Sequence, residues 1–348
     1  MSDTSAATKD GAATDALVVE GLSTWFFTKQ GIVKAVDDVS FTVRHRETLA
    51  IVGESGCGKS MTALSLMRLI PDPPGRIVAG KITMGDLDVL ALDEPTMRKV
   101  RGDKISMIFQ EPMTSLNPVM TIGHQIAEAF ILHRDVTGDA AMKRAVEMLD
   151  IVRIPEPAQR AREYPHQLSG GMRQRAMIAM ALACDPEVLI ADEPTTALDV
   201  TIQAQILDLI LDLQKKMGTA VVLITHDLGV VAETAQRVIV MYAGRKVEEA
   251  EVGDLFARPL HPYTRGLMRS IPRLGLVRGE EIGTGERLQE IPGIVPPLFD
   301  LPEGCAFAPR CTIADDRCRR DYPPYEQKQS GHWAACWHAG EAEGGSHG

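Results

Sequence analysis

Long apolar runs are absent from this chain of 348 residues. No stretch reaches the roughly 18 apolar residues of a membrane-spanning helix, and the longest, such as residues 220–225, fit buried strands. Residues 1–15 are small and polar and lack the apolar segment of a signal peptide, so we expect a disordered tail there. These absences predict a soluble protein that reaches a membrane only through a partner.

Basic residues are fewer than acidic ones: 47 acidic and 37 basic side chains give a net charge of −10. This balance argues against nucleic-acid binding by bulk electrostatics. Cysteines number only six, too few for a disulfide scaffold at this length. The 45% of hydrophobic and 24% of charged residues are ordinary for a globular protein and exclude wholesale disorder. The length suits one large domain or two.

Strand and helix signals alternate in the second half of the chain. Strands are predicted at 188–191, 220–225 and 238–242, and helices between them at 202–216 and 228–235. Such alternation predicts a largely parallel sheet with helices on both faces. Residues 120–165 are helical in pattern, short strand-like runs lie at 16–19, 33–43 and 76–89, and proline becomes frequent after about residue 255. The change near 255 indicates a domain boundary.

The segment GESGCGKS at residues 53–60 fits the phosphate-binding loop G-x-x-x-x-G-K-[ST] without a mismatch. A predicted strand precedes it and a helix comes after it, as that motif requires, which favours nucleotide binding over a glycine turn of chance resemblance. Lys59 is expected to reach the β- and γ-phosphates, and the Ser60 hydroxyl to coordinate Mg²⁺. The predicted nucleotide contacts here are Gly53, Ser55, Gly56, Cys57, Gly58, Lys59, Ser60 and Met61. Cys57 is expected to act as a small filler residue.

A second strand, in EVLIADEPTTALD at residues 187–199, ends in two carboxylates. In a parallel sheet Asp192 is delivered beside the phosphate loop, where it can hold the Mg²⁺ shell. Glu193 follows directly, placed to orient or deprotonate the attacking water. A solvent-exposed acidic turn is the alternative, and the phosphate loop makes it the weaker one.

The segment LSGGMRQR at residues 168–175 narrows the family, because here the chain resembles the ATP-binding subunit of an ABC transporter. The resemblance implies roles for residues that would mean little alone. Gln110 and His226 take the places of the Q-loop glutamine and the switch histidine, which join Glu193 in catalysis. Ser60, Gln110 and Asp192 form the Mg²⁺ set. Further nucleotide contacts are implied at Phe26, which stacks on adenine, at Ser169, Gly170 and Gly171, which close on an opposing subunit's γ-phosphate, and at Asp199 after Ala197 and Leu198.

The resemblance also implies a fold and a division of the chain. The fold is an α/β P-loop NTPase domain with a RecA-like parallel sheet core, an antiparallel β subdomain and a helical subdomain. We expect the ATPase domain at 16–258, with its helical subdomain at about 111–168. A small Pro- and Cys-rich C-terminal domain is expected at 259–340, and a disordered tail at 341–348.

Several stretches look like the peptide and nickel importer branch of that family: QEPMTSLNP at 110–118, YPHQLSGGMRQR at 164–175, ITHDLGVVAE at 224–233 and HPYTRGL at 261–267. This branch implies an ATPase on the cytoplasmic face of the plasma membrane, where ATP-driven dimer closure and hydrolysis-driven opening energise peptide import. Two membrane permeases and an extracytoplasmic solute-binding protein are the implied partners, with no nucleic acid. Because the chain holds one phosphate loop, a second ATPase subunit is required, commonly a related chain. A soluble ABC ATPase outside transport, or an importer of nickel or another small solute, is the alternative.

Four cysteines cluster near the C-terminus: Cys305, Cys311, Cys318 and Cys336. Four thiols in a cytosolic segment indicate metal rather than disulfides, and their spacing lacks the C-x₂-C pairs of zinc ribbons. The family tail looks similar, and in some members it holds a [4Fe–4S] cluster. A zinc site with His332 or His338 among its ligands, and reduced cysteines without metal, are the alternatives.

Overall fold

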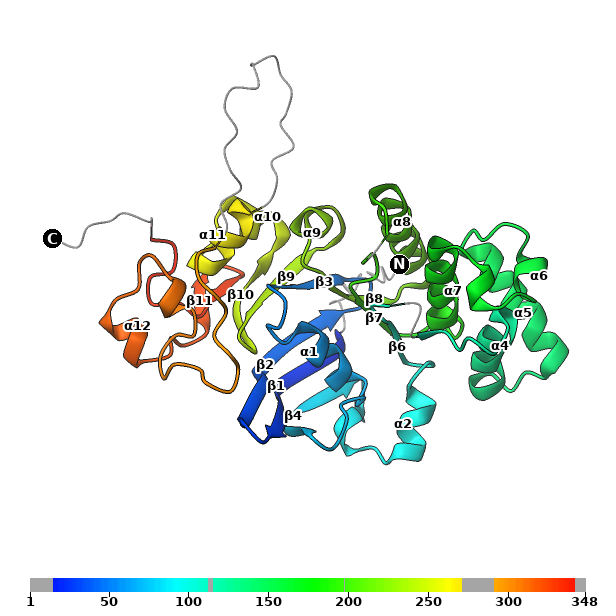
Figure 1. Ribbon diagram of the computed structural model, residues 1–348, viewed down its shortest axis with the longest axis horizontal. Coiled ribbons are helices and arrows are strands. Elements are labelled where there is room, and N and C mark those ends of the chain that lie inside the picture. The colour runs from blue at the N-terminus through cyan, green and yellow to red at the C-terminus, as the bar shows by residue number, and fades with distance from the viewer. Residues whose placement is uncertain (1–14, 112–114, 197, 271–290, 342–348) are drawn as a thin grey trace, which may run out of the picture.

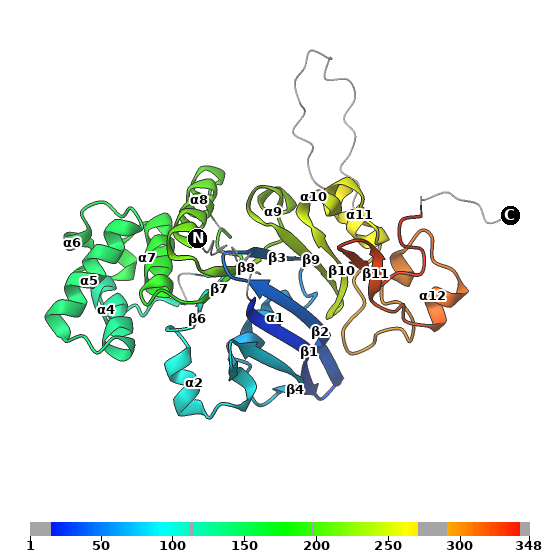
Figure 2. The same cartoon turned by 180° about the vertical axis from the view of Figure 1, so that it is seen from behind.

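The computed structural model describes residues 15–111, 115–196, 198–270 and 291–341 (Figure 1). The predicted tails lie almost wholly outside these ranges, as does Ala197. The molecule is elongated, with the helices α4 to α7 at one end and α11, α12 and β11 at the other (Figures 1 and 2). Two sheets lie between these ends. Among the described residues, no helix is both long and apolar enough to cross a membrane.

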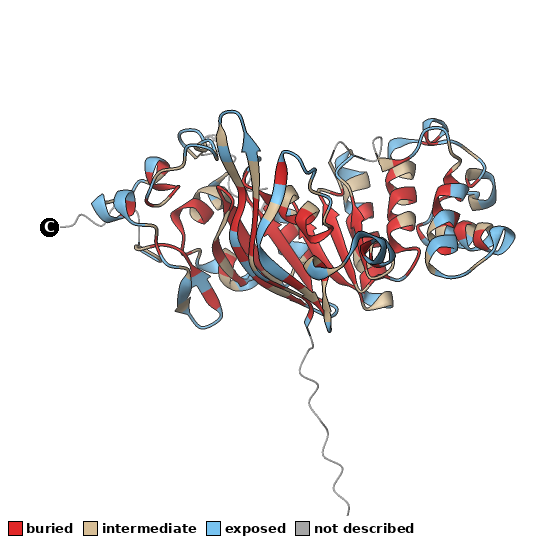
Figure 3. Ribbon diagram, turned by 90° about the horizontal axis from the view of Figure 1, so that it is seen from below, coloured by how far each residue is buried: buried red, intermediate tan, exposed pale blue. Residues whose placement is uncertain are grey.

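The larger sheet has eight strands in the order β11-β12-β10-β9-β3-β8-β7-β6. Five consecutive strands that end at the edge strand β6 run parallel: β9 (Arg237–Tyr242), β3 (Thr48–Val52), β8 (Ala220–Ile224), β7 (Val188–Asp192) and β6 (Ile105–Ile108). Every residue of β3, β7 and β8 is buried, as strands covered on both faces must be (Figure 3). Because these strands are parallel, their carboxyl ends bring the predicted site segments to one edge.

The smaller sheet is antiparallel, in the order β2-β1-β4-β5. Its strands are β1 (Asp15–Thr28), β2 (Gly31–Arg44), β4 (Gly75–Met84) and β5 (Leu87–Asp88). The helix α1 (Lys59–Leu66) packs between the two sheets, where Ala63 and Leu66 join the apolar side chains of both. The predicted antiparallel β subdomain is therefore present, and it covers the face of the parallel sheet beside the phosphate loop.

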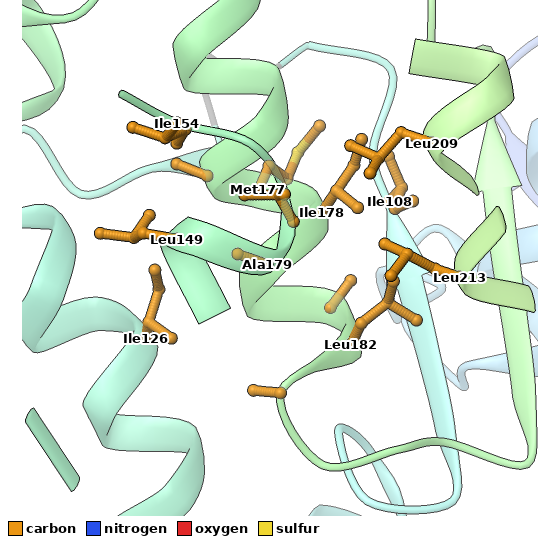
Figure 4. Close-up of a cluster of buried hydrophobic side chains, with 14 of the residues drawn as sticks. Ile108, Ile126, Leu149, Ile154, Met177, Ile178, Ala179, Leu182, Leu209 and Leu213 are labelled. Atoms are coloured by element: carbon orange, nitrogen blue, oxygen red, sulfur yellow. The ribbon is translucent and has the colours of Figure 1, made fainter. Parts of the chain in front are cut away.

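The other face of the parallel sheet is covered by helices. These helices are α7 (Gly170–Leu182), α8 (Val200–Met217), α9 (Leu228–Thr234), α10 (Val252–Ala257) and α11 (Pro262–Arg269). The helical subdomain adds α4 (Ile122–His133), α5 (Gly138–Ile151) and α6 (Pro157–Arg160), while α2 (Glu94–Val100) comes after β5. Figure 4 shows how Ile126, Leu149 and Met177 meet in one buried cluster that reaches Ile108 of β6. This packing fixes the helical subdomain to the sheet.

The C-terminal region joins the larger sheet. Its strands β11 (Glu326–Gln329) and β12 (His332–Ala334) pair antiparallel, and β12 adds to β10 (Arg245–Glu251). The C-terminal region also contains two short helices, η3 (Ala308–Arg310) and α12 (Asp316–Arg320). Two further short helices, η1 (Val89–Ala91) and η2 (Pro165–Gln167), lie earlier in the chain. The boundary between residues 258 and 259 stays a prediction, because the two strands beyond it complete a sheet that begins before it.

A buried carboxylate ties this region together. Glu248 of β10 is 0% exposed and accepts the backbone N–H groups of Leu260 and His261 at 2.7 and 3.0 Å. Its Oε1 also lies 2.7 Å from Nε2 of His332, which is itself buried. His332, an alternative zinc ligand predicted from the sequence, is therefore already paired with the Glu248 carboxylate. Because a buried charge needs several partners, this network fixes where α11 begins.

His261 makes the fold sensitive to acid. Its Nδ1 accepts the N–H of Tyr263 at the start of α11, and burial lowers its pKa from 6.5 to about 4. The unfolded chain therefore binds a proton between about pH 6.5 and pH 4 that the folded chain does not, so stability falls as pH falls through this window. We expect a loss of roughly 3 kcal/mol between pH 7 and pH 4 from this group alone.

Urea unfolding at pH 7 and at pH 4.5 checks this expectation against His261→Asn. Asparagine keeps an acceptor at the helix start but does not titrate. The free energy of unfolding of the variant should fall less on acidification than that of the unchanged chain. Equal losses in both proteins would show that His261 is not the group responsible.

Candidate active site

The phosphate loop runs between β3 and α1, and two of its glycines leave no room for a side chain. Gly53 has φ +150°, and a Cβ there would lie 2.3 Å from the Met241 carbonyl oxygen. Gly58 has φ +103°, and a Cβ there would lie 2.2 Å from the Ala35 carbonyl oxygen. Both the left-handed backbone and the close neighbours require glycine at these positions. The loop is thus pressed against β2 and β9 and holds one shape.

Lys59 and Ser60 begin α1 directly after the loop. The Lys59 ammonium is buried and donates to the carbonyl oxygens of Gly53 and Glu54, at 2.7 and 3.1 Å. Ser60 Oγ donates to Asp192 Oδ1 at 3.1 Å, which joins two residues of the predicted Mg²⁺ set. Burial raises the pKa of Asp192, and the hydrogen bond from Ser60 opposes that rise. A cation at this point would keep the carboxylate charged.

Glu193 lies in a left-handed backbone conformation, with φ +45°, just beyond the end of β7. Its Oε2 accepts from Gln110 Nε2 at 3.0 Å and from Thr196 Oγ1 at 2.9 Å. Its Oε1 lies 3.2 Å from Nδ1 of His226. The structure therefore brings together the three residues predicted to be catalytic. Thr196 is an added partner that sequence reasoning missed, because a threonine three residues beyond a glutamate carries no signal.

The environment of Glu193 keeps it ionised. Burial acts to raise its pKa, but hydrogen bonds from His226 and Thr196 outweigh it, so the pKa is lowered overall. An ionised carboxylate beside a phosphate loop can orient or deprotonate water.

These residues surround one cavity of about 180 Å³. Its walls include Ser55, Gly56, Gly58, Lys59, Ser60, Met61, Gln110 and Glu193, all predicted from the sequence, together with Ala35 and Leu298. Leu298 comes from the C-terminal region, and no motif points to it. A cavity lined by phosphate-loop residues and by a carboxylate that can act as a general base suits the triphosphate group of a nucleotide.

Two predicted contacts lie away from this cavity wall. Phe26 is half-buried, and its ring lies beside Gly75, its partner on the neighbouring strand β4. Its role in stacking on adenine stays a prediction. The Cys57 side chain is 1% exposed, with its sulfur 3.9 Å from Lys59 Nζ, and burial raises its thiol pKa. Cys57 therefore fills space under the loop.

The remaining predicted contacts lie at the starts of two helices. Ser169 caps α7 by accepting the Met172 N–H at 3.4 Å, and Asp199 caps α8 by accepting the Ile202 N–H at 3.0 Å. Ser169 and Gly170 are exposed, Gly171 is partly exposed, and none of the three lines the phosphate cavity. They are accessible to a second chain.

Comparison with known proteins places this arrangement in a family. The family model of the ABC transporter matches residues 36–196, and the model of the oligopeptide/dipeptide transporter C-terminal region matches residues 247–318. A "Probable peptide ABC transporter ATP-binding protein y4tR" of Sinorhizobium fredii is 57% identical over 325 residues, which cover 93% of this chain and 95% of that protein. This chain belongs to the ABC transporter family of ATP-binding proteins. The predicted family and fold class are confirmed.

Other matches to this ABC protein agree. The oligopeptide transport ATP-binding protein AppD of Bacillus subtilis is 53% identical over 321 residues, which cover 92% of this chain and 96% of AppD. Among solved structures, a dimeric post-hydrolysis state of the ATP-binding cassette MJ0796 bound to ADP and Pi matches with a TM-score of 0.61 and 29% identity. That match covers 68% of this chain and 98% of the cassette.

The four C-terminal cysteines line a second cavity, in the C-terminal region. Apolar residues such as Phe307 and Ala308 form much of its wall, together with His261 and His338. Burial raises the pKa of Cys318 to about 11 and that of Cys336 to about 12. These thiols therefore stay protonated at neutral pH unless a cation replaces the protons.

The two histidines of this cavity are already engaged. His261 caps α11, and His338 lies 3.0 Å from both Asp315 Oδ2 and Glu341 Oε2. Within the described ranges, the one group of three ligand atoms that all lie within 4.8 Å of one another is Asp315, Cys318 and His338. In a tetrahedral zinc site, with Zn–S near 2.3 Å, four sulfurs would lie about 3.8 Å apart. Among the described residues, no three of the four cysteine sulfurs lie within 4.8 Å of one another.

Proposed function

We propose that this ABC protein binds and hydrolyses ATP on the cytoplasmic face of the plasma membrane and thereby energises peptide import. The observation that carries the proposal is the Glu193 carboxylate, held by Gln110, Thr196 and His226 at the mouth of the phosphate-loop cavity. The names of the relatives and the match of the C-terminal model support peptides as the cargo class.

The chain's own groups divide the work of hydrolysis. Loop N–H groups and Lys59 bind the β- and γ-phosphates, because backbone dipoles and the ammonium both favour negative charge there. Ser60, Asp192 and Gln110 would hold Mg²⁺, which when bound neutralises charge on the phosphates. Glu193 orients the attacking water and accepts its proton, while His226 holds the carboxylate from the other side.

A second ATPase subunit completes the site. Ser169, Gly170 and Gly171 are exposed and lie outside the cavity, so we assign them to the γ-phosphate of an opposing chain, with Asp199 beside them. ATP then joins two subunits, and its hydrolysis lets them part. The partner we propose is a related ATPase, as is common in the peptide importer branch, and a second copy of this chain is the alternative. Two permeases and, indirectly, an extracytoplasmic binding protein complete the transporter.

Two experiments test the transport proposal. An affinity-tagged chain should co-purify with two permeases and a second ATPase. Deletion of the chain should abolish uptake of a labelled peptide, and the unchanged gene should restore it. Unchanged peptide uptake would contradict the proposal. Loss of nickel uptake instead would favour a nickel importer, and an ATPase that purifies without permeases would favour a role outside transport.

We further propose that Cys305, Cys311, Cys318 and Cys336 hold a [4Fe–4S] cluster. The donor set supports it, because four thiols line one largely apolar cavity while His261 and His338 are engaged elsewhere. When bound, the cluster would link the segments before and after η3 to α12 and to the segment after β12, which is a structural role. Zn²⁺ on Asp315, Cys318 and His338 is the alternative.

Protein purified without oxygen is expected to contain iron and acid-labile sulfide in equal amounts. Its absorption spectrum should show a broad band in the visible range. Cys336→Ser should lose most of both, because one thiolate ligand is removed. Cys184→Ser is the matched control, since Cys184 lies in the ATPase core and bonds to the Ala129 carbonyl. Zinc without iron would replace the cluster by a zinc site, and absence of both would contradict any metal.

A further inference from the structure

The phosphate loop is held by the C-terminal region through one loop residue, Glu54. Arg310 Nη1 donates to Glu54 Oε2 at 2.7 Å, and Nη2 donates to Oε1 at 3.0 Å. This is the paired geometry in which a guanidinium and a carboxylate bind most strongly. The two residues are 256 positions apart in sequence. The ion pair therefore joins two regions of the molecule at the nucleotide site itself.

Arg310 is fixed on every side. Its side chain is 3% exposed, and it also donates to the carbonyl oxygens of Pro292 and Ile291, at 3.1 and 3.2 Å. The guanidinium lies 5.9 Å from the ring centres of both Tyr242 and Phe307. A buried guanidinium that lost its carboxylate would be left without charge compensation, so the pairing with Glu54 is strongly favoured.

A second contact holds the backbone of the same loop residue. The Glu54 N–H donates to the Tyr263 hydroxyl at 2.7 Å. Tyr263, in α11, is 0% exposed and packs against Tyr242 and Phe307, with ring centres 4.7 and 5.5 Å apart. Both the side chain and the amide of Glu54 are thus anchored from beyond residue 258. The Glu54 carbonyl oxygen in turn accepts from Lys59.

The turn that carries Arg310 lies between two of the cavity cysteines. The Ala308 N–H donates to the Cys305 carbonyl at 2.9 Å, and the Cys311 N–H donates to the Ala308 carbonyl at 3.3 Å. Arg310 ends the short helix η3 that Ala308 begins, and its own N–H donates to the Phe307 carbonyl at 2.9 Å. The backbone of Arg310 is therefore tied by hydrogen bonds to the segment that carries Cys305 and Cys311.

We propose that the C-terminal cysteine region sets the affinity of the phosphate loop for nucleotide, with Arg310 and Tyr263 as positioning residues. They act through Glu54, which places the loop carbonyls that orient Lys59. The proposal rests on the proposed function, that this loop binds ATP. By thermodynamic reciprocity, nucleotide in the loop must also stabilise the turn at residues 305–311.

The test measures the dissociation constants of Mg·ATP and Mg·ADP on the full chain. Arg310→Met is expected to raise both at least tenfold, and Arg310→Lys, which keeps the charge but loses the fork, to raise them less. Arg319→Met is the matched control, because Arg319 is an exposed arginine of the same region that pairs with Asp316. It should leave both constants within twofold. Hydrogen exchange at 305–311 should slow when ATP is added to the unchanged chain, but not to Arg310→Met.

Further variants separate positioning from unfolding. Tyr263→Phe removes a single hydroxyl from a packed ring and should raise the constants several-fold, even if Arg310→Met fails to fold. Glu54→Gln combined with Arg310→Met should be no worse than Arg310→Met alone, since both break one contact. Folded Arg310→Met and Tyr263→Phe with unchanged constants would overturn the proposal. Failure of the unchanged chain to bind ATP would instead overturn the proposed function.

Discussion

Glu193→Gln is expected to lower the kcat of ATP hydrolysis by about 10²- to 10⁴-fold, with little change in ATP affinity. The amide cannot accept a proton from water, yet it keeps the size of the carboxylate and part of its contacts with Gln110 and Thr196. Binding depends on the loop and Lys59 instead. Steady-state phosphate release and equilibrium ATP binding on the same preparation measure the two effects.

The same variant should accumulate an ATP-bound dimer, because closure precedes hydrolysis. Size-exclusion chromatography with the partner ATPase and Mg·ATP shows this directly. Glu233→Gln is the control. It makes the same chemical change at an exposed glutamate on α9. Turnover of Glu193→Gln within a few-fold of the unchanged protein would mean that another group activates the water.

Lys59→Met is expected to weaken ATP binding at least about a hundredfold. It removes the buried ammonium that faces the phosphates, a loss that typically costs about 2–5 kcal/mol for a desolvated charge contact. It also leaves the carbonyl oxygens of Gly53 and Glu54 without a donor they now use, so the loop itself relaxes. Equilibrium titration with a fluorescent ATP analogue gives the ratio of dissociation constants.

Lys104→Met controls for the loss of one positive charge. Lys104 is partly exposed and pairs with Glu187 at 3.0 Å, away from the cavity lining. The affinity of the Lys104→Met variant for ATP should stay within twofold of that of the unchanged chain. A folded Lys59→Met protein that binds ATP normally would show that Lys59 has no part in binding.

Much of the site can be predicted from local sequence because its parts sit at strand ends. The segment 53–60 and the pair Asp192–Glu193 each come after a fully buried strand, and parallel strands bring such ends to one edge. The contact between Ser60 and Asp192 is a direct result, although the residues lie 132 positions apart. Strand direction brings both segments to the same edge of the sheet, and the order β3-β8-β7 then leaves one strand between them.

The contacts made by the C-terminal region were not predictable in the same way. Arg310 and Leu298 lie in a Pro-rich segment without periodicity, so no pattern fixes which way their side chains point. The strands β11 and β12 are four and three residues long and mostly polar, too short for an alternation to show. Their pairing depends on the exposed edge of β10, which is a property of the assembled sheet. Glu54 itself occupies a variable position of the loop motif.

Strand β10 also shows why the cassette needs the C-terminal segment. A chain that stopped at residue 258 would present the backbone of β10 as a bare sheet edge, with Glu248 and Glu249 no longer paired to Ala334 and Trp333. Open edges recruit strands from other molecules, and the Glu248 carboxylate would lose His332 as well. The C-terminal segment therefore covers the edge of β10 that would otherwise be open to pairing with another molecule.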